Sequence, residues 1–255
     1  MSPAISKPFV GHRGYPAAYP ENTLASVEAA LRAGAEYLEV DVQLSRDGQP
    51  VLFHDRTLER LCRQSGSIHD YDWSRLQDFR VSYQRQADSQ TAGYPIPHLS
   101  ELIGVLNAWP QVTAFIELKR ISLERFGIAA MVDTVLQQLV KAPSQCVIIS
   151  YAQDALAYVR ENTRLPIGVV IDNWAERTQP SIAELEPEYL FCDIDSLPAS
   201  GSLAFGHSRL VVFECTDPCQ AEAVLARGVD LVETFAIGEM LSAYKGKNAA
   251  GTSTD

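Results

Sequence analysis

The segment Tyr37-Leu38-Glu39-Val40-Asp41-Val42 places two acidic residues within an otherwise apolar run. Side chains of a β-strand alternate between its two faces, so Glu39 and Asp41 share one face and lie roughly 6.5–7 Å apart along the chain. Like charges beside a hydrophobic core are costly unless a cation lies between them. The segment therefore predicts a buried strand that carries a metal site.

Short apolar runs of this kind alternate along the chain with segments of helical period, such as the one marked by Leu24, Val27 and Leu31. The eight predicted strands cover residues 9–10, 37–42, 114–116, 146–149, 167–171, 189–191, 210–213 and 231–232. Repeated strand-helix units imply parallel strands with right-handed crossovers, and eight units close into a barrel. We therefore predict an α/β fold, a TIM (β/α)8 barrel; a doubly wound open sheet is the alternative.

One segment interrupts this alternation after the second strand. Asp47-Gly48 is a strong turn signal and residues 51–53 are apolar, which predicts a hairpin that ends at His54-Asp55. Residues 55–97 are rich in polar and turn residues, and we interpret them as an inserted, cap-like segment over the barrel mouth. The rest of residues 1–255 forms one domain, in which residues 245–255 are expected to be a flexible tail.

Composition limits the kinds of function. With a net charge of −11 and only 21 basic residues in a chain of 255, a nucleic-acid surface is not expected. The 5 cysteines are odd in number and include no close pairs of the zinc-binding kind, so we expect them to be reduced thiols. No segment has the features of a signal peptide and no run approaches the roughly 20 apolar residues of a membrane span, so we expect a cytoplasmic protein. The sequence leaves the oligomeric state open.

Polar residues follow several of the predicted strands. His12, Glu39, Asp41, Glu117 and Lys119 would all fall at the carboxyl ends of barrel strands, where barrel active sites form. Three carboxylates favour a hard divalent ion such as Mg2+ or Ca2+, which leaves the histidines, including His54, free for proton transfer. Each motif alone has a structural explanation: a rim histidine, a solvated strand face, a turn, or a helix cap. Their joint occurrence favours chemistry.

The motifs also stand in a specific order along the chain. They are His12-Arg13-Gly14, Pro20-Glu21-Asn22-Thr23, Glu39-Val40-Asp41 with Asp47-Gly48, His54-Asp55, Ile96-Pro97-His98-Leu99 and Ile116-Glu117-Leu118-Lys119. In order and spacing this set resembles the glycerophosphodiester phosphodiesterase family, densely from His12 to Lys119 and more thinly beyond. The resemblance implies a TIM barrel and an enzyme that cleaves glycerophosphodiesters to glycerol 3-phosphate and an alcohol.

The resemblance also implies roles for individual residues. Glu39, Asp41 and Glu117 would hold the divalent metal, and His12 and His54 would be the acid and base pair. Arg13 and Lys119 would contact the substrate phosphate, and Glu21 would support them or the metal site. Direct attack by water and attack by a neighbouring glycerol hydroxyl, through a cyclic phosphate, both remain open. So does the choice between Mg2+ and Ca2+.

Two segments depart from the family pattern. Residues 213–216 read Phe-Glu-Cys-Thr where the family usually has Trp-Thr-Val-Asn, and Phe235 follows Thr234 where it usually has aspartate. These positions bear on the substrate alcohol, and Glu214 favours either a cationic head group or a structural ion pair. A sugar-phosphate isomerase or aldolase and a catalytically silent ligand-binding barrel are the alternative functions.

Overall fold

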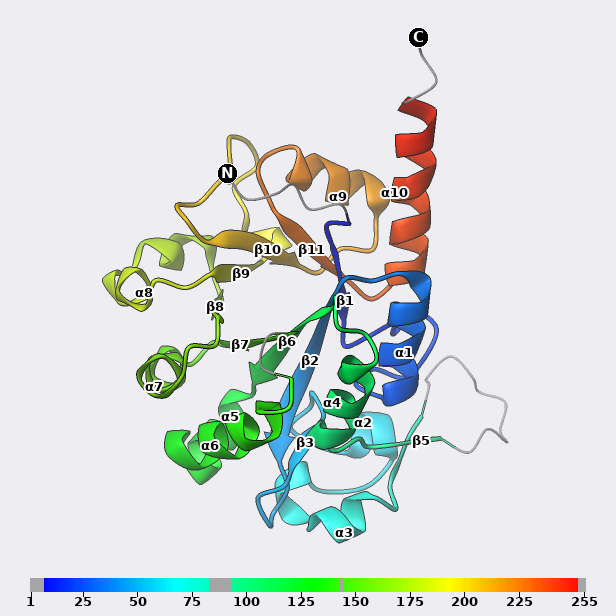
Figure 1. The fold of residues 1–255 in the computed structure, drawn as a ribbon, viewed down its shortest axis with the longest axis vertical. Helices are drawn as coiled ribbons and strands as arrows, with labels where there is room; N and C mark the ends of the chain where they lie inside the picture. Colours follow the sequence, from blue (N-terminus) through cyan, green and yellow to red (C-terminus); the bar gives the residue numbers. More distant parts are fainter. Residues whose placement is uncertain (1–6, 83–92, 143–144, 252–255) are drawn as a thin grey trace.

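The computed structural model describes residues 7–82, 93–142 and 145–251, which form a closed barrel of parallel strands wrapped by helices (Figure 1). Each barrel strand pairs in parallel with its neighbours, and pairing of the first strand with both the second and the last closes the ring. The eight strands are β1 (Phe9–His12), β2 (Tyr37–Leu44), β6 (Thr113–Leu118), β7 (Cys146–Ser150), β8 (Ile167–Ile171), β9 (Tyr189–Asp193), β10 (Arg209–Phe213) and β11 (Leu231–Thr234). The predicted TIM barrel is confirmed, and the open sheet is excluded.

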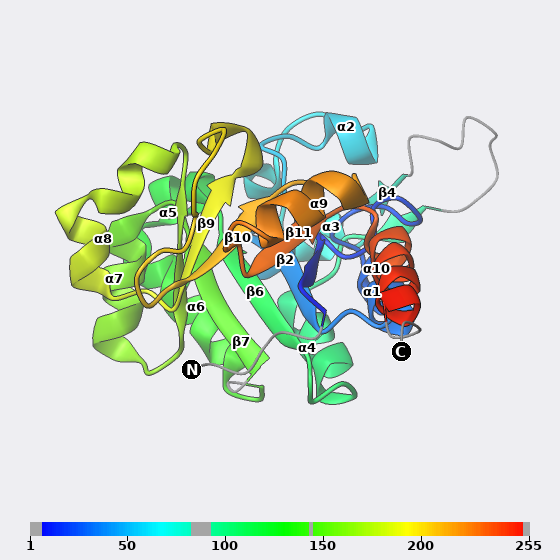
Figure 2. The same cartoon turned by 90° about the horizontal axis from the view of Figure 1, so that it is seen from above.

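Helices lie on the outside of the barrel, as Figure 2 shows from above. They are α1 (Leu24–Ala33), α4 (Leu99–Asn107), α5 (Arg120–Phe126), α6 (Ile128–Leu139), α7 (Gln153–Asn162), α8 (Pro180–Leu185), α9 (Pro218–Leu225) and α10 (Ile237–Gly251). Helix α1 begins where the Thr23 side chain accepts a hydrogen bond from the backbone of Ser26, and it ends at Gly34 in a left-handed conformation. Its buried residues pack toward the strands.

Strand alternation divides the core into two layers. Leu38, Val40 and Val42 of β2 face the helices, whereas Phe115 of β6 and Phe191 of β9 face the barrel interior, where their rings meet edge to face. Glu39 and Asp41 belong to the inward set. The acidic pair is therefore directed into the barrel by the same alternation that buries its apolar neighbours.

The segment after β2 forms a satellite structure with its own apolar core. Strand β3 (Pro50–Leu52) pairs antiparallel with β2, which confirms the predicted hairpin. Short helices α2 (Glu59–Cys62) and α3 (Trp73–Leu76), a 3-10 turn and the two-residue strands β4 (Arg80–Val81) and β5 (Tyr94–Pro95) follow. Part of the predicted insertion, residues 83–92, lies outside the described residues. Whether the segment acts as a cap stays a prediction.

Helical structure extends further toward the C-terminus than the sequence indicates, and the flexibility of this end stays a prediction. Residues 245–251, predicted as the start of a flexible tail, continue helix α10, which packs beside α1 and β1 (Figure 2). The helix is anchored by Ile237, Met240 and Leu241, which are buried at its first turns. The described helices include none that is long and apolar enough to cross a membrane. All five cysteines are free thiols, as expected.

Candidate active site

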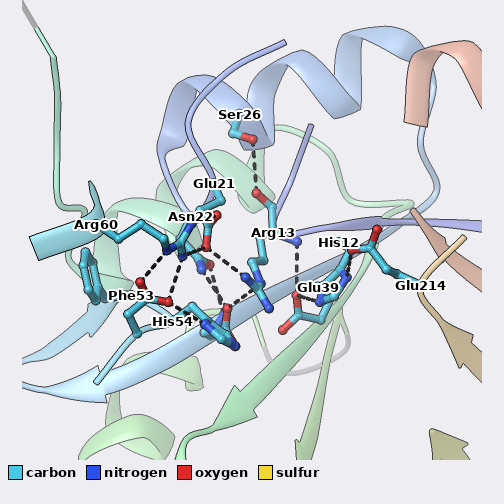
Figure 3. Close-up of polar contacts among 12 residues, drawn as sticks. His12, Arg13, Glu21, Asn22, Ser26, Glu39, Phe53, His54, Arg60 and Glu214 are labelled. Carbon is cyan, nitrogen blue, oxygen red and sulfur yellow. Dashed lines mark hydrogen bonds and ion pairs between the residues drawn. The ribbon is translucent and has the colours of Figure 1, made fainter. Parts of the chain in front are cut away.

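The end of β1 and the turn that follows it place His12 and Arg13 at the barrel mouth. Arg13 has a φ of 56° and Gly14 a φ of 88°, and a Cβ on Gly14 would lie 2.5 Å from Ser26 Oγ. Only glycine fits there, so Gly14 allows the chain to turn sharply against α1. The Arg13 backbone carbonyl accepts a hydrogen bond from Ser26 Oγ, and its backbone N–H donates to Glu39 at 3.1 Å (Figure 3).

Three carboxylates from two neighbouring strands meet inside the barrel mouth. Oxygen atoms of Glu39, Asp41 and Glu117 all lie within 4.8 Å of one another. Register explains the meeting, because Asp41 of β2 is paired directly with Glu117 of β6. Glu39 and Asp41 are almost fully buried, and Glu39 Oε1 has no hydrogen-bond partner among the described residues. Such an all-oxygen set, in which the buried Glu39 Oε1 is unsatisfied, fits a hard divalent cation.

Two basic side chains already contact this acidic cluster. Lys119 Nζ lies 3.1 Å from Asp41 Oδ1 and 2.9 Å from Glu117 Oε1, and Arg13 Nε lies 3.2 Å from Asp41 Oδ2. Asn22 donates to the same Asp41 oxygen at 2.7 Å and accepts from the Asp41 backbone N–H at 3.1 Å. Asp41 therefore belongs to the carboxylate cluster and also contacts both basic side chains.

Charge is distributed unevenly over the three carboxylates. Burial alone would raise the pKa of Asp41, but the charges of Lys119 and Arg13 outweigh burial and lower it. Burial raises the pKa of Glu39 well above its usual range, and the Asp41 charge adds to the rise. Burial also raises the pKa of Glu117, although Lys119 opposes it. Negative charge is thus least compensated at Glu39, where a cation would favour the ionised form most.

His54 is held by a carboxylate on one ring nitrogen. Its Nδ1 lies 2.9 Å from Asp55 Oδ1, so Nε2 is left to face a reacting group. The backbone here is fixed by the buried Gln43, whose side-chain amide donates to the carbonyls of Phe53, His54 and Asp55 at 2.9, 3.2 and 2.8 Å. A single β2 side chain therefore fixes the loop that carries the histidine.

His12 is surrounded by acids. Its Nδ1 lies 3.5 Å from Glu214 Oε2, and its Nε2 lies 3.7 Å from Glu39 Oε2 (Figure 3). The same Nε2 lies 3.8 Å from Glu233 Oε2. The ring stacks on Phe235. Burial lowers the pKa of His12 and the nearby Arg13 charge lowers it further. Both histidines thus have a carboxylate near Nδ1, but that of His12 is more distant.

Two cavities open beside these residues. One of about 450 Å³ is lined by His54, Asp55, Glu117, Lys119 and Tyr151, among others. The second, of about 490 Å³, is lined by Tyr19, Glu21, Arg60, Phe235 and Glu239, among others. The first contains a candidate base, an ammonium and a candidate metal ligand within one space. Such convergence of polar groups in a cavity is typical of a small-molecule site.

The sequence profile of the glycerophosphoryl diester phosphodiesterase family matches residues 12–212, which include the histidines, all three carboxylates and Lys119. The chain belongs to this family.

Curated relatives match the chain over part of their length. A glycerophosphodiester phosphodiesterase of Bacillus altitudinis is 31% identical over 147 residues, which are 57% of this chain and 58% of that protein. Glycerophosphoinositol inositolphosphodiesterase GDPD2 of Mus musculus is 28% identical over 259 residues, covering 89% of this chain and 46% of that protein. The chain therefore spans only about half the length of these curated relatives.

Solved structures cover the chain more completely. An Oleispira antarctica phosphodiesterase, in complex with its product sn-glycerol-3-phosphate, is 26% identical with a TM-score of 0.79, covering 93% of this chain and 96% of that one. A glycerophosphodiester phosphodiesterase of Thermotoga maritima is 23% identical with a TM-score of 0.72, covering 94% and 99%. This second likeness shows a shared fold.

The structure of this family member brings the predicted site residues to one end of the barrel. Glu21, expected to support the metal or phosphate residues, contacts Arg13 at 2.9 Å and Arg60 at 2.8 Å. It lies outside the Glu39–Asp41–Glu117 cluster and forms a second, half-buried group with His54 and Asp55, whose potential ligand atoms also lie within 4.8 Å of one another. The sequence interpretation missed Gln43, Arg60 and Glu233. Gln43 shares the inward face of β2 with Glu39 and Asp41, so alternation could have indicated it.

Proposed function

We propose that the protein is a metal-dependent phosphodiester hydrolase that cleaves glycerophosphodiesters to glycerol 3-phosphate and an alcohol. The observation that carries this proposal is the meeting of Glu39, Asp41 and Glu117 between two histidines that both have a carboxylate near Nδ1. A family relative with bound sn-glycerol-3-phosphate supports the choice of substrate class. A cytoplasmic location and the lack of a nucleic-acid partner remain predictions from the sequence.

Glu39, Asp41 and Glu117 would hold the divalent ion, either Mg2+ or Ca2+. When bound, the ion would act as a Lewis acid that withdraws charge from the phosphoryl oxygens. The buried Glu39 oxygen that lacks a hydrogen-bond partner among the described residues supports this ligand set. Oxygen ligands of this kind suit either ion, so the choice between them rests on experiment.

Arg13 and Lys119 would bind the substrate phosphate. Both side chains are held by Asp41, Arg13 through Nε and Lys119 through Nζ, which fixes them before substrate arrives. A phosphodiester carries a negative charge that repels a nucleophile, and pre-positioned cations offset that repulsion without further reorganisation. Lys119 also lines the cavity that His54 lines, so its ammonium lies where the phosphate is expected.

His12 and His54 would move the protons. One imidazole takes a proton from the attacking hydroxyl, and the other gives a proton to the alkoxide oxygen that leaves, so charge is conserved through the reaction. The attacking hydroxyl belongs either to water or to the adjacent glycerol carbon. The carboxylates near the two Nδ1 atoms would orient each ring so that Nε2 faces the phosphoester.

Hydrolysis of glycerophosphocholine and glycerophosphoethanolamine, with Mg2+ or Ca2+ and with chelator, tests the proposal. We expect release of glycerol 3-phosphate that chelator abolishes, and a fall in turnover of roughly 10²–10⁴-fold in His12→Ala and His54→Ala. His207→Ala, at an exposed histidine, is the matched control. Binding of the diester without turnover would contradict the proposal in favour of a silent barrel, and conversion of a sugar phosphate would favour an isomerase or aldolase.

A further inference from the structure

Arg60, on the short helix α2 of the inserted segment, reaches back to the barrel and binds two carboxylates at once. Its Nε and Nη2 donate to the two oxygens of Asp55 at 2.5 and 2.8 Å. Its Nη1 and Nη2 donate to the two oxygens of Glu21 at 2.8 Å each (Figure 3). All the donors used belong to one planar guanidinium, whose fork matches carboxylates in a way that lysine cannot reproduce.

Each of these carboxylates touches a residue of the proposed reaction. Asp55 Oδ1 accepts a hydrogen bond from His54 Nδ1 at 2.9 Å, and Arg60 Nη2 contacts the same oxygen. Glu21 Oε1 accepts from Arg13 Nη1 at 2.9 Å. A chain of short contacts therefore runs from His54 through Asp55, Arg60 and Glu21 to Arg13, and Arg60 is its central link.

Without Arg60 the two carboxylates would repel each other. Oxygen or nitrogen atoms of Glu21, His54 and Asp55 all lie within 4.8 Å of one another, and such like charges disfavour close approach unless a cation separates them. Burial would raise the pKa of Asp55, but hydrogen bonds from His54 and Arg60 lower it. Arg60 thus keeps Asp55 ionised as well as in place. Glu21 retains a second cation, Arg13, and depends on Arg60 less.

We propose that Arg60 is a positioning residue, which fixes His54 for proton transfer by holding Asp55 against Glu21. The inference rests on the proposed hydrolase function. It gives the inserted segment a part in that function, because helix α2 supplies Arg60 as a clamp that holds Asp55 beside His54. Loss of Arg60 should slow the chemical step and leave substrate binding largely unchanged. The reason is that Arg13, a proposed phosphate ligand, keeps its own contact with Glu21.

A competing role for Arg60 is direct contact with substrate, since its side chain lines the cavity of about 490 Å³ beside Phe235. The two roles differ in kinetics. Loss of a residue that only binds substrate raises KM, whereas loss of one that orients a proton-transfer group lowers kcat. They differ also in dependence on His54, because a residue that acts through His54 has nothing left to position once that imidazole is removed.

The test compares Arg60→Gln and Arg60→Lys with Arg46→Gln, using glycerophosphocholine and saturating Mg2+ or Ca2+. Arg46 is the matched control because it also makes a bidentate pair in this region, to Asp72 at 2.8 and 2.6 Å, but contacts no site residue among those described. We expect kcat to fall roughly 10- to 100-fold in Arg60→Gln, the range for residues that orient active-site ligands. Arg60→Lys should recover part of the loss, and KM should change by less than about threefold.

The decisive comparison repeats Arg60→Gln in the His54→Ala background, where the second substitution should lower kcat by less than about twofold. An equal loss in both backgrounds, or a loss confined to KM, would overturn the proposal. Circular dichroism and thermal melting establish that each variant is folded, and Arg60→Lys serves if Arg60→Gln is not. An inactive wild-type protein would count against the hydrolase function itself, whereas an active wild type with unimpaired Arg60→Gln counts against the clamp alone.

Discussion

The imidazole of His12 stacks on the ring of Phe235, with centroids 4.8 Å apart and planes inclined by 24°. The same ring lies 5.5 Å from the guanidinium carbon of Arg13. Phe235 follows β11 directly, so it lies at the barrel mouth beside His12, the last residue of β1, and Arg13, which follows it. One apolar ring thereby packs against both a proposed proton-transfer group and a proposed phosphate ligand.

Removing that ring should slow the reaction. Aromatic stacking contributes about 0.5–1.5 kcal/mol, so Phe235→Ala should lower kcat/KM roughly 2- to 10-fold by loosening His12. Phe235→Tyr keeps the ring and should stay close to wild type. Steady-state kinetics on glycerophosphocholine measure both, and equal rates for Phe235→Ala and wild type would show that the stacking does not position His12.

Metal binding should stabilise the fold, because the ion would neutralise three buried carboxylates. At a metal concentration 100 times Kd the expected gain is about 2.7 kcal/mol. For a chain of this size that corresponds to a rise in Tm of roughly 5–10 °C. Glu39→Gln should abolish most of the rise, since Glu39 has the least compensated charge.

Thermal melting with Mg2+, with Ca2+ and with chelator measures this effect independently of catalysis. Glu124→Gln, at an exposed position on helix α5, is the matched control and should respond to metal as wild type does. A Tm that neither ion moves would remove Glu39, Asp41 and Glu117 as a metal site.

The parts of the fold that follow a local rule could be predicted from the sequence. All eight barrel strands and the hairpin after β2 were indicated by apolar runs bounded by turn residues, and closure followed from their number. The end of α10 could not be predicted in this way. Residues 245–251 have no regular apolar face, and they continue a helix whose anchoring residues, such as Ile237 and Leu241, come before them.

The same distinction applies to the site, where residues placed by a local rule could be predicted and the others could not. Glu39, Asp41 and Glu117 could be placed together because strand alternation and parallel pairing fix where they point. Arg60 could not be, because its role depends on how α2 folds back against the loop after β1, and no periodicity in the sequence encodes that contact. Glu233 has the inward register of β11 but stands in a short apolar strand, where a lone acid is hard to distinguish from a surface residue.

Glu214 should make stability depend on pH. Burial raises its pKa to about 7, while the Arg13 charge lowers it and the Glu21 charge raises it. In the unfolded chain the carboxyl titrates near its ordinary value of 4.5. Between these two values the folded state holds a proton that the unfolded state has lost, so stability falls as the pH rises through this window.

Glu214→Gln removes this titration, so its free energy of unfolding relative to wild type should increase from about pH 5 to about pH 8. Urea unfolding in chelator at the two pH values measures the change. Glu161→Gln, at an exposed position on α7, controls for the loss of one negative charge. A constant difference between Glu214→Gln and wild type across the window would contradict the assigned environment of Glu214.

Gly168 on β8 lies in a closely packed part of the barrel interior, where an added Cβ would lie 2.8 Å from the Phe191 ring and 2.9 Å from an Ile149 methyl group. Both neighbours are buried in the packed core and have little room to move, so Gly168→Ala should destabilise the fold by about 1–3 kcal/mol. Gly104 provides the contrast, because it lies exposed within helix α4 and an added Cβ would meet no atom within 4 Å. Gly104→Ala should therefore stabilise the protein by about 0.5–1 kcal/mol through its effect on backbone entropy. Urea unfolding measures the change in the free energy of unfolding for each variant. Stabilisation by Gly168→Ala would mean that the interior is less closely packed than these contacts require.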